Sequence, residues 1–214
     1  MTLISTADII GFDCDSTLST LEGIDELAIR ADVGEQMIAL TNQAMDGIVP
    51  LEAVYKQRLE LIRPNKQAID WLAQRYIETI VDGVAEVFKQ LLAQGKTVHI
   101  ISGGIREAIV PLAQQLGIPD NQLHAVSVLF NKDGSYQGFD ENSPLARSGG
   151  KADICRKISN QQAFIMIGDG KTDLESQQAG ACFVGFGGVV AREAVLEQAD
   201  YCIREASLLG LLTL

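Results

Sequence analysis

Four short polar stretches of this sequence carry residue types that together could bind and cleave a phosphate ester. Asp13 and Asp15 stand one residue apart at the end of the apolar run ADIIGFD, and Ser102 is followed by two glycines. Lys151 lies in the stretch SGGKAD, and the stretch GDGKTD at 168–173 adds two more carboxylates. An aspartate is ionised at neutral pH, so one of the first pair could attack phosphorus directly while the other transfers the proton.

The same stretches offer ligands for a divalent cation and for the phosphate itself. The carboxylates of Asp13, Asp169 and Asp173 are hard oxygen donors with no sulfur or imidazole beside them, which favours Mg2+. A hydroxyl, a lysine and backbone N–H groups left accessible by glycine are suited to phosphoryl oxygens. The residues expected to provide these groups are Ser102, Gly103, Gly104 and Lys151.

The elements that precede the polar stretches explain how they could meet. Short apolar runs at 7–13, 97–102 and 163–169 are typical of buried parallel strands. In an open parallel sheet, ligands bind at the carboxyl ends of the strands. Three polar strand ends in one such sheet are therefore expected to converge on one rim.

The rest of the chain predicts the fold class. From about residue 81 onwards, strand and helix patterns alternate, which indicates a parallel sheet covered by helices on both faces. Apolar residues at three-to-four spacing between about 20 and 80 predict about four consecutive helices instead, and the Asp-Gly pair at 133–134 predicts a β-hairpin. We expect an α/β fold, a doubly wound parallel-sheet (Rossmann-like) core with a small helical-bundle cap inserted after the first strand. The expected domains are a catalytic core of 1–16 and 81–214 and a cap of 17–80.

In order along the chain, DCDST, ISGG, the lysine of ARSGGK and GDGKTD resemble the motifs of the haloacid dehalogenase-like phosphatases. The stretches STLEGIDELA, AMDGIVP, QRLELIRP, GFD and FVGFGG extend the resemblance to the phosphoserine phosphatase family over nearly the whole chain. The resemblance implies a Mg2+-dependent enzyme of serine biosynthesis that hydrolyses O-phospho-L-serine to L-serine and phosphate through an aspartyl-phosphate intermediate. Thr172 departs from many bacterial members, which have Asn there, and is similar to eukaryotic-type members.

The resemblance also implies a role for each residue. Asp13 would be the nucleophile and Asp15 the general acid and base. Glu22 would bind the ammonium group of the substrate and Arg58 its carboxylate, both from the cap, and Met45 would line the substrate, although core packing explains a methionine there nearly as well. The residues implied in substrate binding are Glu22, Met45, Arg58, Ser102, Gly103, Gly104, Lys151 and Thr172, and those implied in metal binding are Asp13, Asp15, Asp169 and Asp173.

Two other interpretations of the same residues stay open. The chemistry could serve another small phosphate ester or transfer the phosphoryl group to another acceptor, such as an alcohol. Alternatively, the chain could be a non-catalytic protein that binds a phosphorylated metabolite, although such a protein has no use for the Asp13–Asp15 pair. By composition alone, Glu22 and Arg58 are surface charges on amphipathic helices, yet they are the residues that favour an amino-acid substrate.

The composition restricts the partners and the location. The 214 residues carry a formal net charge of −11, and no basic stripe is expected, which argues against nucleic acid as a partner. The four cysteines lie far apart, as is typical of reduced thiols. The first residues lack a signal-peptide pattern, and no run approaches the roughly 20 apolar residues that a membrane helix needs. We therefore expect a cytoplasmic monomer or homodimer that acts on a small molecule, without a membrane.

Overall fold

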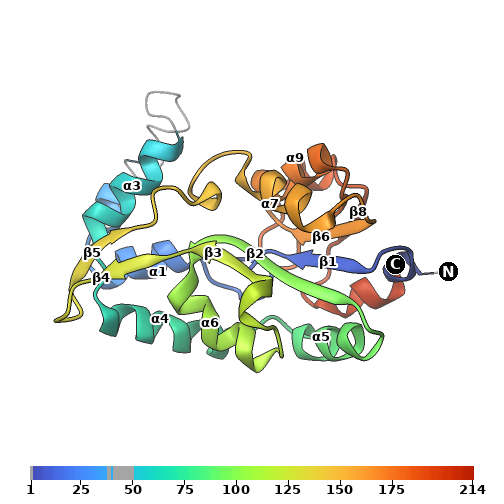
Figure 1. Cartoon of the computed structure of the whole chain (residues 1–214), viewed down its shortest axis with the longest axis horizontal. Coiled ribbons are helices and arrows are strands. Elements are labelled where there is room, and N and C mark those ends of the chain that lie inside the picture. The colour runs from blue at the N-terminus through green and yellow to red at the C-terminus, as the bar shows by residue number, and fades with distance from the viewer. Residues whose placement is uncertain (1, 38–39, 41–50) are drawn as a thin grey trace.

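The structure is a computed structural model that describes residues 2–37, 40 and 51–214. Within these ranges, six strands form a parallel sheet in the order β3-β2-β1-β6-β7-β8, and β4 and β5 form a separate antiparallel pair (Figure 1). The strands are β1 (Ile9–Phe12), β2 (Thr97–Ile105), β3 (Leu123–Val126), β4 (Val128–Phe130), β5 (Tyr136–Phe139), β6 (Phe164–Gly168), β7 (Cys182–Phe186) and β8 (Tyr201–Ile203).

Helices cover both faces of the six-stranded sheet, with α5 and α6 on one face and α7 and α9 on the other (Figure 1). A further group of helices, α1, α3 and α4, follows β1 in the chain and lies beyond one end of the sheet. The helices are α1 (Gly23–Arg30), α3 (Leu51–Ile62), α4 (Lys66–Glu78), α5 (Val84–Ala93), α6 (Arg106–Gln115), α7 (Gly150–Ser159), α8 (Lys171–Leu174) and α9 (Glu193–Leu196).

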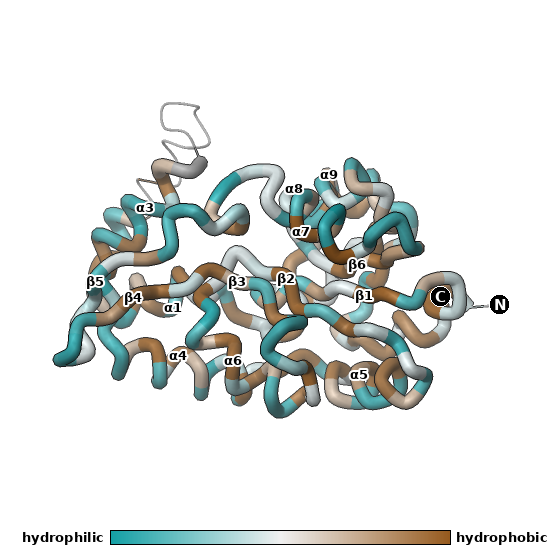
Figure 2. The backbone as a smooth tube through the Cα atoms, in the orientation of Figure 1, coloured by the Kyte–Doolittle hydropathy of each residue, from teal (hydrophilic) through white to brown (hydrophobic). Residues whose placement is uncertain are grey.

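The central strands are apolar because both faces of the sheet are covered. Every residue of β1 and of β6 is buried, as expected for strands packed between two layers of helices. Figure 2 shows the corresponding hydrophobic stretches along the strands and the inward faces of the helices. The register pairs Phe12 of β1 with Ile100 of β2 and with Ile167 of β6. The segments that follow these three strands therefore emerge at the same edge.

Strand β1 lies between β2 and β6, and the order of the strands reverses at this point. The chain moves from β1 to β2 and β3 on one side, and then returns to β6, β7 and β8 on the other. In open α/β sheets, the carboxyl ends of the strands at such a reversal form the usual binding crevice. The polar residues after β1 and β6 stand at this position.

The helical segment after β1 is tied to the core by two adjacent connections. The backbone N–H of Thr20 donates to the carbonyl of Thr79 at 2.9 Å, and the N–H of Val81 donates to the carbonyl of Leu18 at 2.9 Å. The β4–β5 hairpin also contacts this segment, because the N–H of Lys66 donates to the carbonyl of Gly134 at 2.9 Å. The helical segment is thus held at its two connections and along the hairpin.

The α/β fold, the parallel sheet and the helical segment after the first strand confirm the fold class predicted from the sequence. The Asp-Gly pair lies between β4 and β5, which form the antiparallel hairpin, whereas the neighbouring strand β3 pairs with β2. The helix α8 tightens after Leu174 into a 3-10 helix, and α9 is a short helix of four residues. Within the described ranges, every helix is too short or too polar to span a lipid bilayer.

Candidate active site

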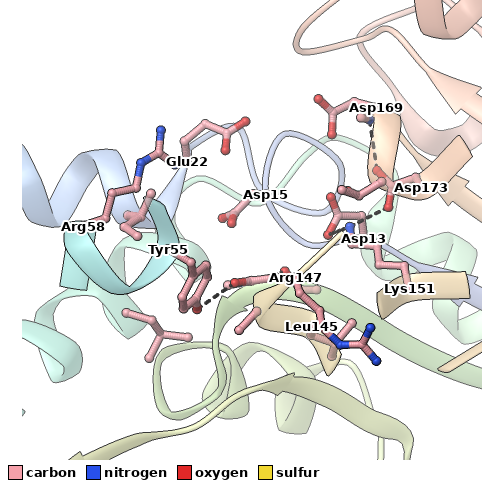
Figure 3. A pocket seen from close by; sticks show the side chains of 18 of the residues that line it. Asp13, Asp15, Glu22, Tyr55, Arg58, Leu145, Arg147, Lys151, Asp169 and Asp173 are labelled. Atoms are coloured by element: carbon pink, nitrogen blue, oxygen red, sulfur yellow. Dashed lines mark hydrogen bonds and ion pairs between the residues drawn. The ribbon is translucent and has the colours of Figure 1, made fainter. Parts of the chain in front are cut away.

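The carboxyl ends of β1 and β6 carry a compact cluster of three aspartates and one lysine, named here the core cluster. Asp13 directly follows β1, Asp169 directly follows β6, Asp173 lies in α8, and Lys151 lies in the first turn of α7. The Nζ atom of Lys151 is 2.8 Å from Oδ1 of Asp13 and 2.5 Å from Oδ1 of Asp173. All four side chains are buried (Figure 3). Lys151 therefore holds together two carboxylates that would otherwise repel each other.

A glycine at the end of β6 makes room for Asp173. A Cβ atom on Gly168 would lie 2.2 Å from the carboxyl carbon of Asp173. The other carboxylate oxygen, Oδ2, accepts a hydrogen bond from the N–H of Gly170 at 3.0 Å. The stretch GDGKTD therefore folds back on itself and directs Asp173 toward Lys151.

Burial and mutual repulsion raise the pKa of two acids in the core cluster. Burial, followed by the charge of Asp13, raises the pKa of Asp169 to about 6, against the opposing effect of Arg192. The same two causes raise the pKa of Asp173. Burial lowers the pKa of Lys151, but the charges of Asp13 and Asp173 outweigh it, so its pKa rises. The cluster thus holds more negative charge than its lysine compensates.

This excess of negative charge and the choice of donors fit a divalent cation. One carboxylate oxygen from each of Asp13, Asp169 and Asp173 lies within 4.8 Å of the others. Carboxylate oxygens are the donors of hard cations, and a bound cation would stabilise the ionised form of each acid. The carboxylate of Asp15, which the sequence grouped with these acids, does not belong to the set within the described ranges.

Asp15 lies between the core cluster and the helical segment (Figure 3). Its Oδ1 atom accepts hydrogen bonds from the hydroxyl of Tyr76 at 2.6 Å and from the backbone N–H of Gly23 at 3.1 Å. Burial, followed by the charges of Glu22 and Asp13, raises the pKa of Asp15 to about 8. A carboxyl group with such a pKa can carry a proton near neutral pH, which a general acid must do.

The helical segment places two further charges on the opposite side from Lys151, where Figure 3 shows Glu22 and Arg58. Glu22 precedes α1, and its Oε1 atom accepts hydrogen bonds from the hydroxyl of Ser16 at 2.7 Å and from Arg192 at 3.3 Å. The Nε atom of Arg192 also donates to Oδ2 of Asp169 at 3.0 Å. Arg192 thus connects the core cluster to the acid that precedes α1.

The Ser-Gly-Gly turn at the end of β2 forms a third wall. The N–H of Gly104 donates to the hydroxyl oxygen of Ser102 at 3.0 Å. From α3, the hydroxyl of Tyr55 donates to the carbonyl oxygen of Gly103 at 3.0 Å. The helical segment therefore contacts this turn directly as well as Asp15.

These walls enclose one cavity of about 280 Å³, a volume suited to a small metabolite. Eleven of the twelve site residues predicted from the sequence line it, and Met45 lies outside the described residues. The lining residues from the prediction are Asp13, Asp15, Glu22, Arg58, Ser102, Gly103, Gly104, Lys151, Asp169, Thr172 and Asp173.

Comparison with known proteins agrees with this geometry. Residues 1–176 match the family model described as haloacid dehalogenase-like hydrolase. The chain belongs to this family. It is 40% identical over 207 residues to a phosphoserine phosphatase of Drosophila melanogaster, which covers 95% of this chain and 77% of that protein. A substrate-bound phosphoserine phosphatase complex superimposes with a TM-score of 0.78 at 27% identity, over 96% of this chain and 97% of the other. A phospho-aspartyl intermediate analogue of phosphoserine phosphatase gives a TM-score of 0.73 at 26% identity, over 97% and 98% of the two chains.

Three residues that contact the site of this haloacid dehalogenase-like hydrolase were missed in the sequence. Tyr55 and Tyr76 lie within amphipathic helices, where a tyrosine usually packs against the core. Arg192 stands in a loop after β7 and has no polar motif around it. Tyr76 is 61 positions from its partner Asp15, and Arg192 is 23 positions from Asp169, so only the fold brings each pair together.

Proposed function

We propose that this haloacid dehalogenase-like hydrolase is a phosphoserine phosphatase that hydrolyses O-phospho-L-serine to L-serine and phosphate. The observation that carries the proposal is the division of charge around the cavity, with Asp13 and Lys151 on one side and Glu22 and Arg58 on the other. Phosphoserine has a phosphate at one end and an ammonium and a carboxylate group at the other. The family membership and the similar Drosophila enzyme support the same substrate.

The reaction begins with Asp13 as the nucleophile. A carboxylate oxygen of Asp13 bonds to phosphorus, the bond between phosphorus and the serine oxygen breaks, and Asp15 gives its proton to that oxygen. The product is an aspartyl-phosphate and free serine. Asp15, now ionised, takes a proton from a water molecule that attacks phosphorus, which releases phosphate and restores Asp13.

The groups around Asp13 hold the phosphoryl oxygens during both steps. Lys151, the hydroxyl of Ser102 and the N–H of Gly103 provide positive charge and hydrogen-bond donors, and Thr172 lies nearby. The N–H of Gly104 holds the Ser102 hydroxyl in place. We assign a Mg2+ site to Asp13, Asp169 and Asp173, where the cation would offset the negative charge of the phosphoryl group. Lys151 and Asp173 keep Asp13 in place through their shared contacts.

Specificity for an amino acid comes from the side of the cavity that faces Lys151. Glu22 binds the ammonium group of the substrate, and Arg58 binds its carboxylate through a planar guanidinium that can form two parallel hydrogen bonds. Met45, which lies outside the described residues, keeps the role that the family resemblance implies, lining the substrate. A phosphate ester without these two charged groups would bind through its phosphate alone.

We further propose that residues 17–80 act as a cap over a core of 1–16 and 81–214. The paired connections at Leu18–Thr20 and Thr79–Val81 are suited to a hinge, because a substrate enclosed on all sides must enter before the cap closes. We propose that the protein acts on its small-molecule substrate as a monomer or a homodimer. The four free cysteines suit the reducing cytoplasm.

A panel of phosphorylated compounds tests the proposed function. Phosphate release should be fastest from phosphoserine, slower from phosphothreonine, and far slower from glycerol phosphate and p-nitrophenyl phosphate. EDTA should abolish the activity and Mg2+ should restore it. Equal turnover of phosphoserine and glycerol phosphate would contradict the assigned substrate, and full activity after exhaustive chelation would contradict the metal.

A further inference from the structure

Tyr76 connects the proposed cap to the acid that moves the proton. It lies in α4, its side chain is fully buried, and its hydroxyl donates a hydrogen bond of 2.6 Å to Oδ1 of Asp15. Asp15 follows β1 and belongs to the core. A buried tyrosine hydroxyl usually has a hydrogen-bond partner, but here that partner is the proposed general acid.

A glycine next to this contact makes it possible. The N–H of Gly23 donates to the same Oδ1 atom of Asp15 at 3.1 Å. A Cβ atom on Gly23 would lie 2.1 Å from the hydroxyl oxygen of Tyr76 and 2.9 Å from its Cζ atom, so any side chain there would displace the tyrosine. The N–H of Gly23 and the hydroxyl of Tyr76 therefore donate to the same carboxylate oxygen, and the lack of a side chain at Gly23 leaves room for the tyrosine.

The other oxygen of Asp15 has different surroundings. A Cβ atom on Gly104 would lie 3.2 Å from Oδ2 of Asp15, which places Oδ2 against the wall of the cavity formed by the Ser-Gly-Gly turn. The proposed function assigns this turn to the phosphoryl group. Since Oδ1 already accepts two hydrogen bonds, Oδ2 is the oxygen available to carry the transferred proton.

We propose that Tyr76 is a positioning residue for proton transfer: together with Gly23 it occupies Oδ1 of Asp15 and leaves Oδ2 directed at the leaving oxygen of the substrate. This inference rests on the proposed function, since it concerns the proton that serine requires when it leaves. Tyr76 itself is not among the residues that line the cavity. Its effect passes through the orientation of Asp15.

The test is Tyr76→Phe, which keeps the ring and removes only the hydroxyl. With phosphoserine, an alkyl ester whose leaving oxygen needs a proton, kcat should fall about 10-fold, a part of the effect of general acid–base catalysis. With p-nitrophenyl phosphate, nitrophenolate leaves without a proton. The kcat/KM for nitrophenolate release, which reports the steps up to the departure of the leaving group, should therefore stay within about twofold of that of the unchanged enzyme.

Two further variants provide controls. Tyr136 is also buried, lies outside the cavity, and its hydroxyl has no hydrogen-bond partner among the described residues. Tyr136→Phe should therefore leave both rates unchanged. Gly23→Ala should slow phosphoserine turnover as Tyr76→Phe does, and the double variant should be no slower than either single variant, because both changes act on one oxygen. Thermal unfolding of each variant checks that it is folded.

The outcomes separate the inference from the function on which it rests. Equal losses for phosphoserine turnover and for the kcat/KM of nitrophenolate release in Tyr76→Phe would mean that the tyrosine only supports the fold. An unchanged kcat for phosphoserine would remove any role in proton transfer. If the unchanged enzyme releases nitrophenolate but does not hydrolyse phosphoserine, the proposed substrate fails instead, and glycerol phosphate replaces phosphoserine in the same comparison.

Discussion

The two sides of the cavity differ in how far their charged side chains are exposed to solvent. On the core side, the side chains of Lys151, Asp13 and Asp173 are 6%, 10% and 0% exposed. On the cap side, the side chain of Glu22 is 40% exposed. The buried ion pairs cannot separate without leaving a charge unpaired in the interior. An exposed charge is screened by water until a ligand covers it. The phosphate side of the site is thus assembled before the substrate arrives, and the specificity side is completed by the substrate.

This difference follows from the elements on each side. The core cluster stands on strand ends and short helices whose backbones are fixed by the sheet register. The cap side lies on helices that join the core through two chain connections, with α4 packed against α6 and with hydrogen bonds such as that of Tyr55. Substitutions of the charged residues should therefore affect all substrates on the core side and individual substrates on the cap side.

The largest effect is expected from Asp13→Asn on the core side. The amide has the shape of the carboxylate but is a poor nucleophile, so phosphoserine turnover should fall roughly 10⁴-fold or more. Phosphate release measures the loss, and thermal unfolding should show a folded protein. p-Nitrophenyl phosphate should be affected equally. Turnover within tenfold of the unchanged enzyme would exclude Asp13 as the nucleophile.

Arg58→Ala should give the next largest effect, and only for the amino-acid substrate. Truncation of one partner in a desolvated Arg–carboxylate pair costs about 2–5 kcal/mol, which corresponds to a loss of roughly 30- to several-thousand-fold in kcat/KM for phosphoserine. p-Nitrophenyl phosphate should hardly respond, because it has no carboxylate.

Arg58→Lys is the matched control, and it should restore the activity only in part, since one ammonium group cannot form the paired contact. If both substrates lost activity equally in Arg58→Ala, the arginine would serve the phosphate or the fold.

The crowding of acids predicts how the stability of the metal-free protein depends on pH. Folding raises the pKa of Asp15 to about 8. The contribution of this shift to the stability of the folded protein is fully present below the ordinary carboxyl pKa and is lost as the pH rises through about 8. Burial and the neighbouring His99 lower the pKa of His124 to about 4. The effect of this shift on stability has the opposite sign, because the stabilisation it gives is lost as the pH falls, and only below about pH 6.5. Between pH 6.5 and 8, stability should therefore fall with rising pH, by up to about 1.4 kcal/mol per unit for each acid whose pKa is raised to about 8.

Melting temperatures in EDTA at pH 6.5 and 8 measure this fall. Mg2+ should reduce it, because the cation stabilises the ionised acids. Asp15→Asn should also reduce it, since the amide does not titrate. If the melting temperature of the metal-free protein rose between pH 6.5 and 8, the raised pKa values of the crowded acids would not control its stability.

The smallest effect is expected from Tyr55→Phe. The variant loses one hydrogen bond between neutral groups, worth about 0.5–1.5 kcal/mol, so kcat/KM should fall roughly 2- to 10-fold. Unlike Arg58→Ala, it should affect phosphoserine and p-nitrophenyl phosphate alike, because both need the turn at Gly103. Steady-state kinetics with the two substrates decides the point. A loss confined to phosphoserine would place Tyr55 among the specificity residues instead.

The core side could be predicted from the sequence because its signals are local. Acids, lysine and glycines stand directly after apolar runs, and parallel strands bring such ends together. The contacts of Tyr76, Tyr55 and Arg192 could not be predicted, since each residue is ordinary in its own helix or loop. Their partners lie 61, 48 and 23 positions away. The boundary between β3 and β4 gives no local signal either, because the two stretches are similarly apolar.

The two adjacent connections of the helical segment have a consequence for how substrate preference can change. An insertion whose ends lie side by side can be replaced as a unit without disturbing the host sheet. A chimaera that carries another cap would keep Asp13, Lys151 and Asp173 in place and so retain its nucleophile. It would lose the tyrosines of α3 and α4 that reach into the core. The backbone of the insertion can therefore be exchanged as a unit, but a graft that keeps the full rate with an alkyl phosphate ester must bring a tyrosine to Asp15.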